Sequence, residues 1–126
     1  MSNFLIPDEP ISGQPCPIRD VLDRIGDQWS LLVLDALERG TRRFNELMRD
    51  LGDISKQMLS RTLKRLEEDG FVQRTVYPEV PPRVEYALTD LGRSFLVPLK
   101  ELVAWANSHQ GMVRDARRQY RSTAPG

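Results

Sequence analysis

Four polar side chains between residues 57 and 64 could make hydrogen bonds to the edges of nucleic-acid bases. Gln57, Ser60, Arg61 and Lys64 fall on one side of a helix when successive residues are rotated by about 100°. Arg can donate two parallel hydrogen bonds to guanine, Gln pairs in a similar way with adenine, and Ser can bind either base, whereas Lys more often contacts phosphate. These residue types at this spacing indicate a helix edge that could read DNA.

The opposite side of the same segment is apolar. Because an apolar side packs on the core, the polar edge is predicted to face solvent. At helical spacing this side holds Met58, Leu59, Thr62, Leu63 and Leu66. Ser55 can cap the helix start, and Gly70 can end the helix. Lys56 adds a positive charge at the end where backbone N–H groups already favour anions. A charged side opposite an apolar one is also typical of any solvated helix, so an ordinary surface helix is the alternative.

The charge around this helix differs from that of the whole chain. The 126 residues include 18 basic and 18 acidic ones, so the formal net charge is zero. Between residues 41 and 66, however, seven basic residues stand against three acidic ones, a net charge of +4. A local excess of Lys and Arg favours a nucleic-acid partner, because these side chains neutralise phosphates.

The neighbouring segments predict a winged helix-turn-helix fold, mainly α with a small β component. Two short helices joined by a tight, Gly-containing turn form the helix-turn-helix. Two segments rich in Val, Thr and Tyr suit strands, and the PEVPP sequence between them suits a hairpin tip, since prolines lack a backbone donor. The expected order is helices over 16–26, 28–40, 42–52 and 55–70, strands over 71–77 and 83–88, and a long helix from Thr89 to about His109.

The hairpin directly follows the helix-turn-helix and is therefore interpreted as a two-stranded β wing. A wing beside a major-groove helix can reach the DNA backbone or the minor groove. Arg83, at the base of the hairpin, is the candidate contact.

Composition excludes several classes of protein. Hydrophobic residues make up 40% of the chain and charged residues 29%, as in a single globular domain. One cysteine and one histidine are too few for a disulfide or an ordinary zinc site, so no metal or cofactor is expected. The absence of a membrane-span pattern favours a cytoplasmic protein. With no phosphate-binding glycine loop or catalytic motif, an enzyme is the weakest functional class.

Three stretches carry a family resemblance. They are CPIRDVLDRIGDQWSLLVLDAL, RFNELMRDLGDISKQMLSRTLKRLEEDGFVQR and VPPRVEYALTDLG, followed by Trp105. In this order they closely resemble the HxlR family of winged helix-turn-helix bacterial transcription regulators, relatives of the MarR group. The resemblance implies a homodimer that binds double-stranded DNA at a pseudo-palindromic operator, with the terminal helices forming the dimer interface. The leading hypothesis is therefore a dimeric, sequence-specific regulator that acts as a repressor or a dual regulator.

The resemblance also implies roles for particular residues. Arg43 would contact the DNA backbone, and Arg83 would serve in the wing. Base reading would fall to Ser55, Lys56, Gln57, Ser60 and Arg61.

The chain divides into three parts. Residues 1–15 have no periodicity and predict a flexible arm, residues 16–110 predict the DNA-binding and dimerisation domain, and residues 111–126 form a basic tail that we expect to fray. The long final helix has an apolar side that is too wide for its own domain to cover. A partner chain that buries this side is the simplest explanation for it. The candidate dimer residues are Ile18, Leu22, Leu99, Leu102, Val103 and Trp105.

Two features leave alternatives open. Cys16 matches a cysteine that some members of the family use to sense oxidants or electrophiles, and a helix N-terminus would favour its thiolate; the alternative is a small buried residue. Leu99, Leu102 and Trp105 could instead line a pocket for a small-molecule effector.

The chain departs from the family where Asp27 and Gln28 precede Trp29, since the family typically has Gly-Lys there. That change puts in doubt a phosphate or effector contact from this turn. A winged helix can also serve as a protein-interaction module without sequence-specific DNA binding, which is the alternative function.

Overall fold

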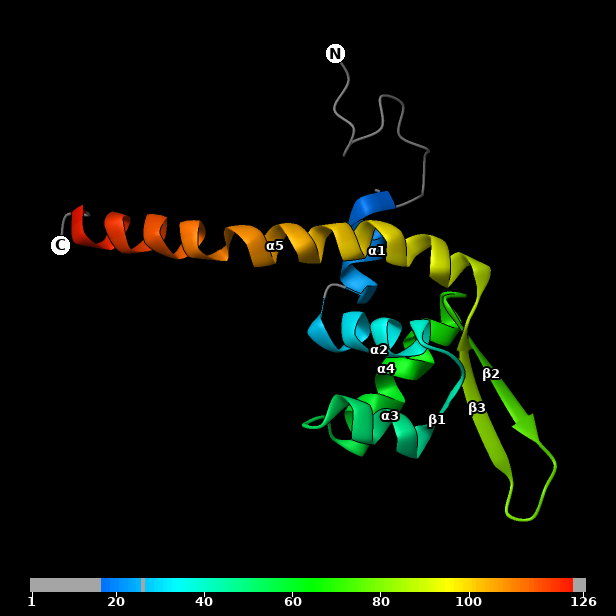
Figure 1. The fold of residues 1–126 in the computed structure, drawn as a ribbon. Coiled ribbons are helices and arrows are strands. Elements are labelled where there is room, and N and C mark those ends of the chain that lie inside the picture. Colours follow the sequence, from blue (N-terminus) through cyan, green and yellow to red (C-terminus); the bar gives the residue numbers. More distant parts are fainter. Residues whose placement is uncertain (1–16, 26, 124–126) are drawn as a thin grey trace.

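Five α-helices and three β-strands make up the part of the chain that the structure, a computed structural model, describes: residues 17–25 and 27–123 (Figure 1). Their order confirms the predicted winged helix-turn-helix. The elements are α1 (Pro17–Ile25), α2 (Gln28–Glu38), β1 (Arg42–Arg43), α3 (Phe44–Leu51), α4 (Lys56–Glu68), β2 (Val72–Tyr77), β3 (Arg83–Leu88) and α5 (Asp90–Thr123). None of these helices is long and apolar enough to cross a membrane.

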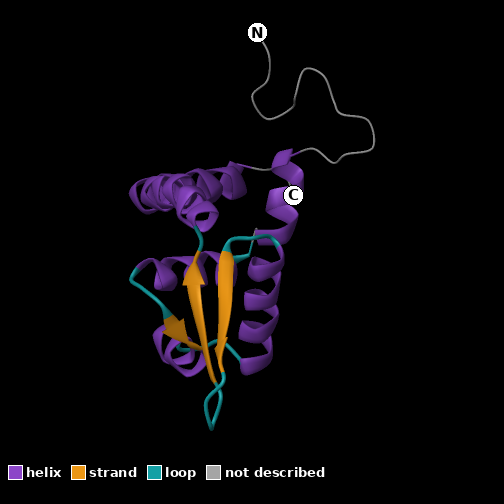
Figure 2. Ribbon diagram, turned by 90° about the vertical axis from the view of Figure 1, so that its right-hand side faces the viewer, coloured by secondary structure: helices purple, strands orange, loops and turns teal. Residues whose placement is uncertain are grey.

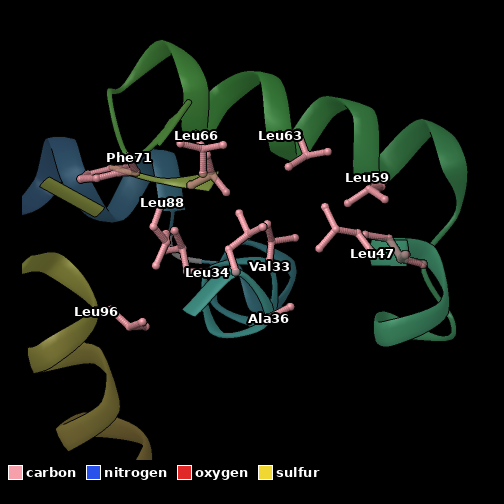
Figure 3. Packing of buried hydrophobic residues seen from close by; sticks show 13 residues of the cluster. Val33, Leu34, Ala36, Leu47, Leu59, Leu63, Leu66, Phe71, Leu88 and Leu96 are labelled. Carbon is pink, nitrogen blue, oxygen red and sulfur yellow. The ribbon is translucent and has the colours of Figure 1, made fainter. Parts of the chain in front are cut away.

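Helix α2 lies at the centre of the hydrophobic core. Val33 and Leu34 of α2 are completely buried. Leu59 and Leu63 of α4 point toward them, and Leu47 of α3 closes the same cluster (Figure 3). Because α4 uses its apolar side to pack on α2, its polar side is left facing away from the core.

The turns around α4 follow the predicted signals. Gly52 ends α3 with a φ of 77°, and the Ser55 hydroxyl oxygen accepts a hydrogen bond of 3.1 Å from the Met58 N–H, which caps α4. Gly70 has a φ of 83° after the last turn of α4. Positive φ suits glycine because it has no Cβ, so these glycines fix both ends of the segment.

The sheet has three strands rather than the two predicted (Figure 2). β2 and β3 form the expected antiparallel hairpin, from Val72 opposite Leu88 to Tyr77 opposite Arg83. β1 pairs with the other edge of β3, so a two-residue strand occupies positions where the sequence predicted the start of a helix. A strand this short has no period of its own and forms only because β3 supplies the partner.

Thr89 joins the end of the wing to the start of α5. Its hydroxyl donates a hydrogen bond of 2.6 Å to the Gly70 carbonyl oxygen and lies 3.0 Å from the Gly92 N–H, which donates to it. One side chain therefore caps α5 and ties it to the end of α4, as the predicted cap at Thr89 requires.

Helix α5 is longer than predicted. The sequence predicted an end near His109 and a frayed tail, but the helix passes Gly111 and continues to Thr123, which makes that prediction wrong. Gly111 does not adopt the positive φ that ends a helix, and the following Arg, Ala and Gln residues favour helix. The C-terminal half of α5 extends beyond the rest of the molecule (Figure 1).

Candidate nucleic-acid interface

The predicted reading edge of α4 is exposed along its whole length. Gln57, Ser60, Arg61 and Lys64 are all exposed, whereas Leu59, Thr62, Leu63 and Leu66 on the other side are buried. The division of the helix into two sides is therefore confirmed. Packing on α2 fixes which way the polar edge points.

Most of the basic residues near this edge are free of carboxylate partners. Lys56, Arg61 and Lys64 have no ion pair recorded within the described chain. Arg42 and Arg65 are different, because Arg42 lies 3.7 Å from both Glu46 and Asp50 and Arg65 lies 2.9 Å from Asp27. The local positive charge is thus concentrated on α4, where it is available to an external anion.

Arg43 lies beside the wing at the start of α3. Its backbone N–H donates a hydrogen bond of 2.9 Å to Glu46, and its side chain is exposed. A hollow of about 450 Å³ separates this end of α3 from the wing tip. It is lined by Arg43, Phe44 and Asn45 on one side and by residues 79–84 on the other.

Arg83 is enclosed by other wing residues. Its guanidinium carbon lies 4.1 Å from the centre of the Tyr77 ring, directly across the hairpin. Its nitrogens lie 3.4 Å from Glu79 and 3.8 Å from Glu85. The structure therefore places Arg83 in the wing, as predicted, but with two carboxylates beside its charge.

Two exposed polar residues near this surface were missed from the sequence. Asn45 lines the same hollow as Arg43, and Arg74 lies on β2. Asn45 could have been found from the sequence, because it lies two residues after Arg43, a candidate DNA contact, in the first turn of α3. Arg74 could be found only after the strand was known to be exposed.

Asp27, one of the two residues that depart from the family pattern, has a structural role. Its carboxylate accepts a hydrogen bond of 2.8 Å from the Ser30 N–H, which caps α2, and a second from the buried Ser30 hydroxyl. It also accepts one of 2.9 Å from Arg65 of α4. Asp27 therefore connects the start of α2 to the reading helix.

The candidate dimer residues lie in three different environments. Leu22, Leu102 and Trp105 are 56%, 62% and 54% exposed, although the Trp105 ring stacks on His109 of the same helix with 4.6 Å between ring centres. Leu99 is partly buried and packs against the core of its own chain, and its place in a dimer interface stays a prediction. Val103 lines a hollow of about 320 Å³ between α2 and α5.

Two predictions fall outside what the structure describes. Cys16 precedes the described residues, and the side chain of Ile18 is not among those described. Their proposed roles remain predictions.

Comparison with known sequences identifies the family. Residues 24–113 match the family model for HxlR-like helix-turn-helix proteins. The chain is 45% identical over 92 residues to the HTH-type transcriptional regulator YtfH of Escherichia coli, which covers 73% of each protein.

Solved structures agree with this assignment. The reduced form of the redox regulator HypR superposes with a TM-score of 0.73 at 36% identity, covering 79% of this chain and 98% of that one. The reduced form of the transcriptional regulator YodB from Bacillus subtilis gives 0.67 at 33% identity, covering 75% and 92%. The chain therefore belongs to the HxlR-like helix-turn-helix family of transcriptional regulators.

Proposed function

We propose that this protein is a homodimeric, sequence-specific DNA-binding repressor that acts in the cytoplasm on a pseudo-palindromic operator. The observation that supports this most directly is the polar edge of α4, which carries Gln57, Arg61 and Lys64 opposite a buried apolar side. The edge is exposed, positively charged and held rigidly by the core. These are the properties that a helix in the major groove requires.

Each residue of the edge has a distinct proposed role. Gln57 and Arg61 bind base edges, and Ser60 adds a shorter contact. Lys56, Lys64 and Arg43 bind phosphates, which fixes the position of α4 on the duplex. Ser55 caps α4, and its hydroxyl lies at the end of the helix that approaches DNA.

Dimerisation would place two reading helices on one operator. The exposed apolar residues Leu22, Leu102 and Trp105 on the first and last helices support a second copy as the partner. Two symmetric copies would contact half-sites about one helical turn, 34–36 Å, apart.

Oxidant or electrophile sensing through Cys16 is the proposed regulation. One structural relative is named as a redox regulator, and Cys16 directly precedes the first helix. A thiolate at a helix N-terminus is stabilised by the backbone dipoles. We expect diamide or a quinone to release DNA from the unmodified protein but not from Cys16→Ser. Equal release from both proteins would show that Cys16 is not the sensor.

Selection of genomic fragments by the purified protein at near-physiological salt tests the proposed function. For a fragment that the unmodified protein retains, Arg61→Ala should weaken the binding free energy by about 1 to 3 kcal/mol and should relax the sequence preference at one base pair. Lys64→Ala should weaken binding to all DNA sequences alike. It should also lower the salt slope, the slope of the logarithm of the binding constant against the logarithm of salt concentration, by about 0.9 in magnitude. Arg114→Ala, an exposed arginine on the distal half of α5, is the matched control and should have no effect.

Retention of DNA that is unchanged by both Gln57→Ala and Arg61→Ala would contradict the assignment of the reading edge. No preference of the unmodified protein for any genomic fragment over random competitor would favour the protein-interaction alternative.

A further inference from the structure

The tip of the wing, residues 78–82, is fully exposed at its centre and carries one charged side chain, Glu79. Val80 has a relative exposure of 101%, and the three prolines around it, Pro78, Pro81 and Pro82, are also exposed. Proline fixes its own φ, so three prolines in five residues restrict the backbone of the tip. The tip is the loop at the free end of the β2–β3 hairpin (Figure 2), where an exposed valine and three prolines lie beside one carboxylate.

The charges of the wing are arranged to cancel near this tip. Glu79 is the acidic residue closest to Val80, and Arg83 lies 3.4 Å from it and 3.8 Å from Glu85. Arg74 lies on the other side of the hairpin, since it pairs with Tyr86 rather than with Glu85. If Arg83 bound a DNA phosphate instead, the carboxylates of Glu79 and Glu85 would lose their partner and lie unpaired beside the DNA backbone, which would repel them.

The hollow between α3 and the wing indicates where a DNA strand could pass. It is lined on one side by Arg43 and Asn45, and on the other by the tip. Arg43 is exposed and has no ion pair within the described chain, so it can bind a phosphate of that strand. With α4 in the major groove on one side of the strand, the tip on the other side meets the adjacent minor groove.

We propose that the wing reads the minor groove through the exposed apolar side chains of Val80 and the prolines near it, and that Arg83 pairs with Glu79 and Glu85 within the wing and binds no phosphate. This inference rests on the proposed DNA-binding function and assigns a specificity-determining residue to it. Apolar side chains are used in this way by proteins that sense the shape of the minor groove. A tip of this kind favours A·T pairs, because G·C pairs place an amino group on the floor of that groove.

Base-pair substitution in a retained operator tests the tip directly. At the pairs that the wing protects from hydroxyl radicals, A·T is replaced by inosine·C, which keeps the minor-groove surface, or by G·C, which adds the amino group. The unmodified protein should bind the A·T and inosine·C operators equally and the G·C operator more weakly. Val80→Ser should lower affinity for the A·T operator about five- to tenfold, the scale of one or two methyl groups lost from a contact, and should remove the preference.

Val76→Ser is the matched control, since Val76 is a half-exposed valine of the same hairpin away from the tip. It should retain both affinity and preference. The charge-balanced double variant Arg83→Gln with Glu79→Gln should retain the salt slope of the unmodified protein. A phosphate contact by Arg83 would instead lower the slope by about 0.9.

The outcomes separate this inference from the proposed function. Unchanged affinity in Val80→Ser, equal weakening by inosine·C and G·C, or a reduced slope in the double variant would each overturn the role of the tip. If the unmodified protein prefers no genomic fragment, the proposed function itself fails. Circular dichroism of each variant verifies that the fold is retained, which the full exposure of Val80 leads us to expect.

Discussion

Two glycines of α5 have opposite surroundings, and the same substitution should act in opposite directions at them. A Cβ at Gly92 would clash with the Phe71 carbonyl oxygen, which already accepts a hydrogen bond of 3.1 Å from the Thr89 N–H and is held in place by it. We therefore expect Gly92→Ala to lower the free energy of unfolding by about 1 to 3 kcal/mol, the usual effect of overpacking. Chemical denaturation provides the measurement.

Gly111→Ala is the matched control for Gly92→Ala. No atom outside the local helix lies within 4 Å of a Cβ at Gly111. Because α5 is helical at Gly111, alanine should stabilise the protein by up to about 1 kcal/mol. A stability loss at Gly111 as large as that at Gly92 would mean that the clash with Phe71 is not the cause.

The start of α2 and the reading helix are linked by one charged hydrogen bond. Asp27→Ala removes the cap of α2 and the partner of Arg65, so we expect a loss of about 1 to 2 kcal/mol in the free energy of unfolding. Arg65→Gln removes only the ion pair, which is about one third exposed, and should cost less than about 1 kcal/mol. In the Asp27→Ala background Arg65→Gln should cost almost nothing. Strict additivity in urea denaturation would show that the two side chains do not interact.

The helices with strong local patterns were predicted well from the sequence. The segment from Ser55 to Gly70 carries its own cap, apolar period and C-terminal glycine, so its exposed edge could be predicted before any contact was known. Gly70 and Gly111 illustrate the limit of such signals. Both are glycines near an expected helix end, but only Gly70 adopts a positive φ.

Features that depend on distant partners were not predictable in this way. β1 requires β3, which lies about forty residues later in the chain. The link between Asp27 and Arg65 spans a sequence separation of 38. The partners of Arg83 became clear only from the register of the hairpin, which brings Tyr77 opposite it. The sequence alone placed a basic side chain, Arg83, in the wing, but it did not show which side chains would contact it.

The molecule as a whole separates two surfaces. The tip of the wing and helix α3 lie away from α5, whose C-terminal half extends on its own (Figure 1). Around α5, the exposed apolar residues fall mainly on one side when successive positions are rotated by about 100°. They are Leu91, Leu102, Trp105, Met112, Val113 and Tyr120. This apolar side continues past the predicted interface into the part of the helix that the sequence had assigned to a tail.

The proposed burial of this apolar side between two copies leads to a prediction about assembly. Leu102→Glu should convert the proposed dimer to a monomer at micromolar concentration, because it places a charge on the apolar side of α5. It should leave the fold of the chain intact, since Leu102 is 62% exposed. Val97→Glu, at a similarly exposed position about 120° from the centre of the apolar side, should remain dimeric. Sedimentation equilibrium distinguishes these outcomes. Operator affinity provides a second measurement, and it should fall at least a hundredfold for Leu102→Glu but not for Val97→Glu, because a monomer cannot bind both half-sites in one complex. A monomeric unmodified protein, or a dimeric Leu102→Glu variant, would contradict the placement of the interface on α5.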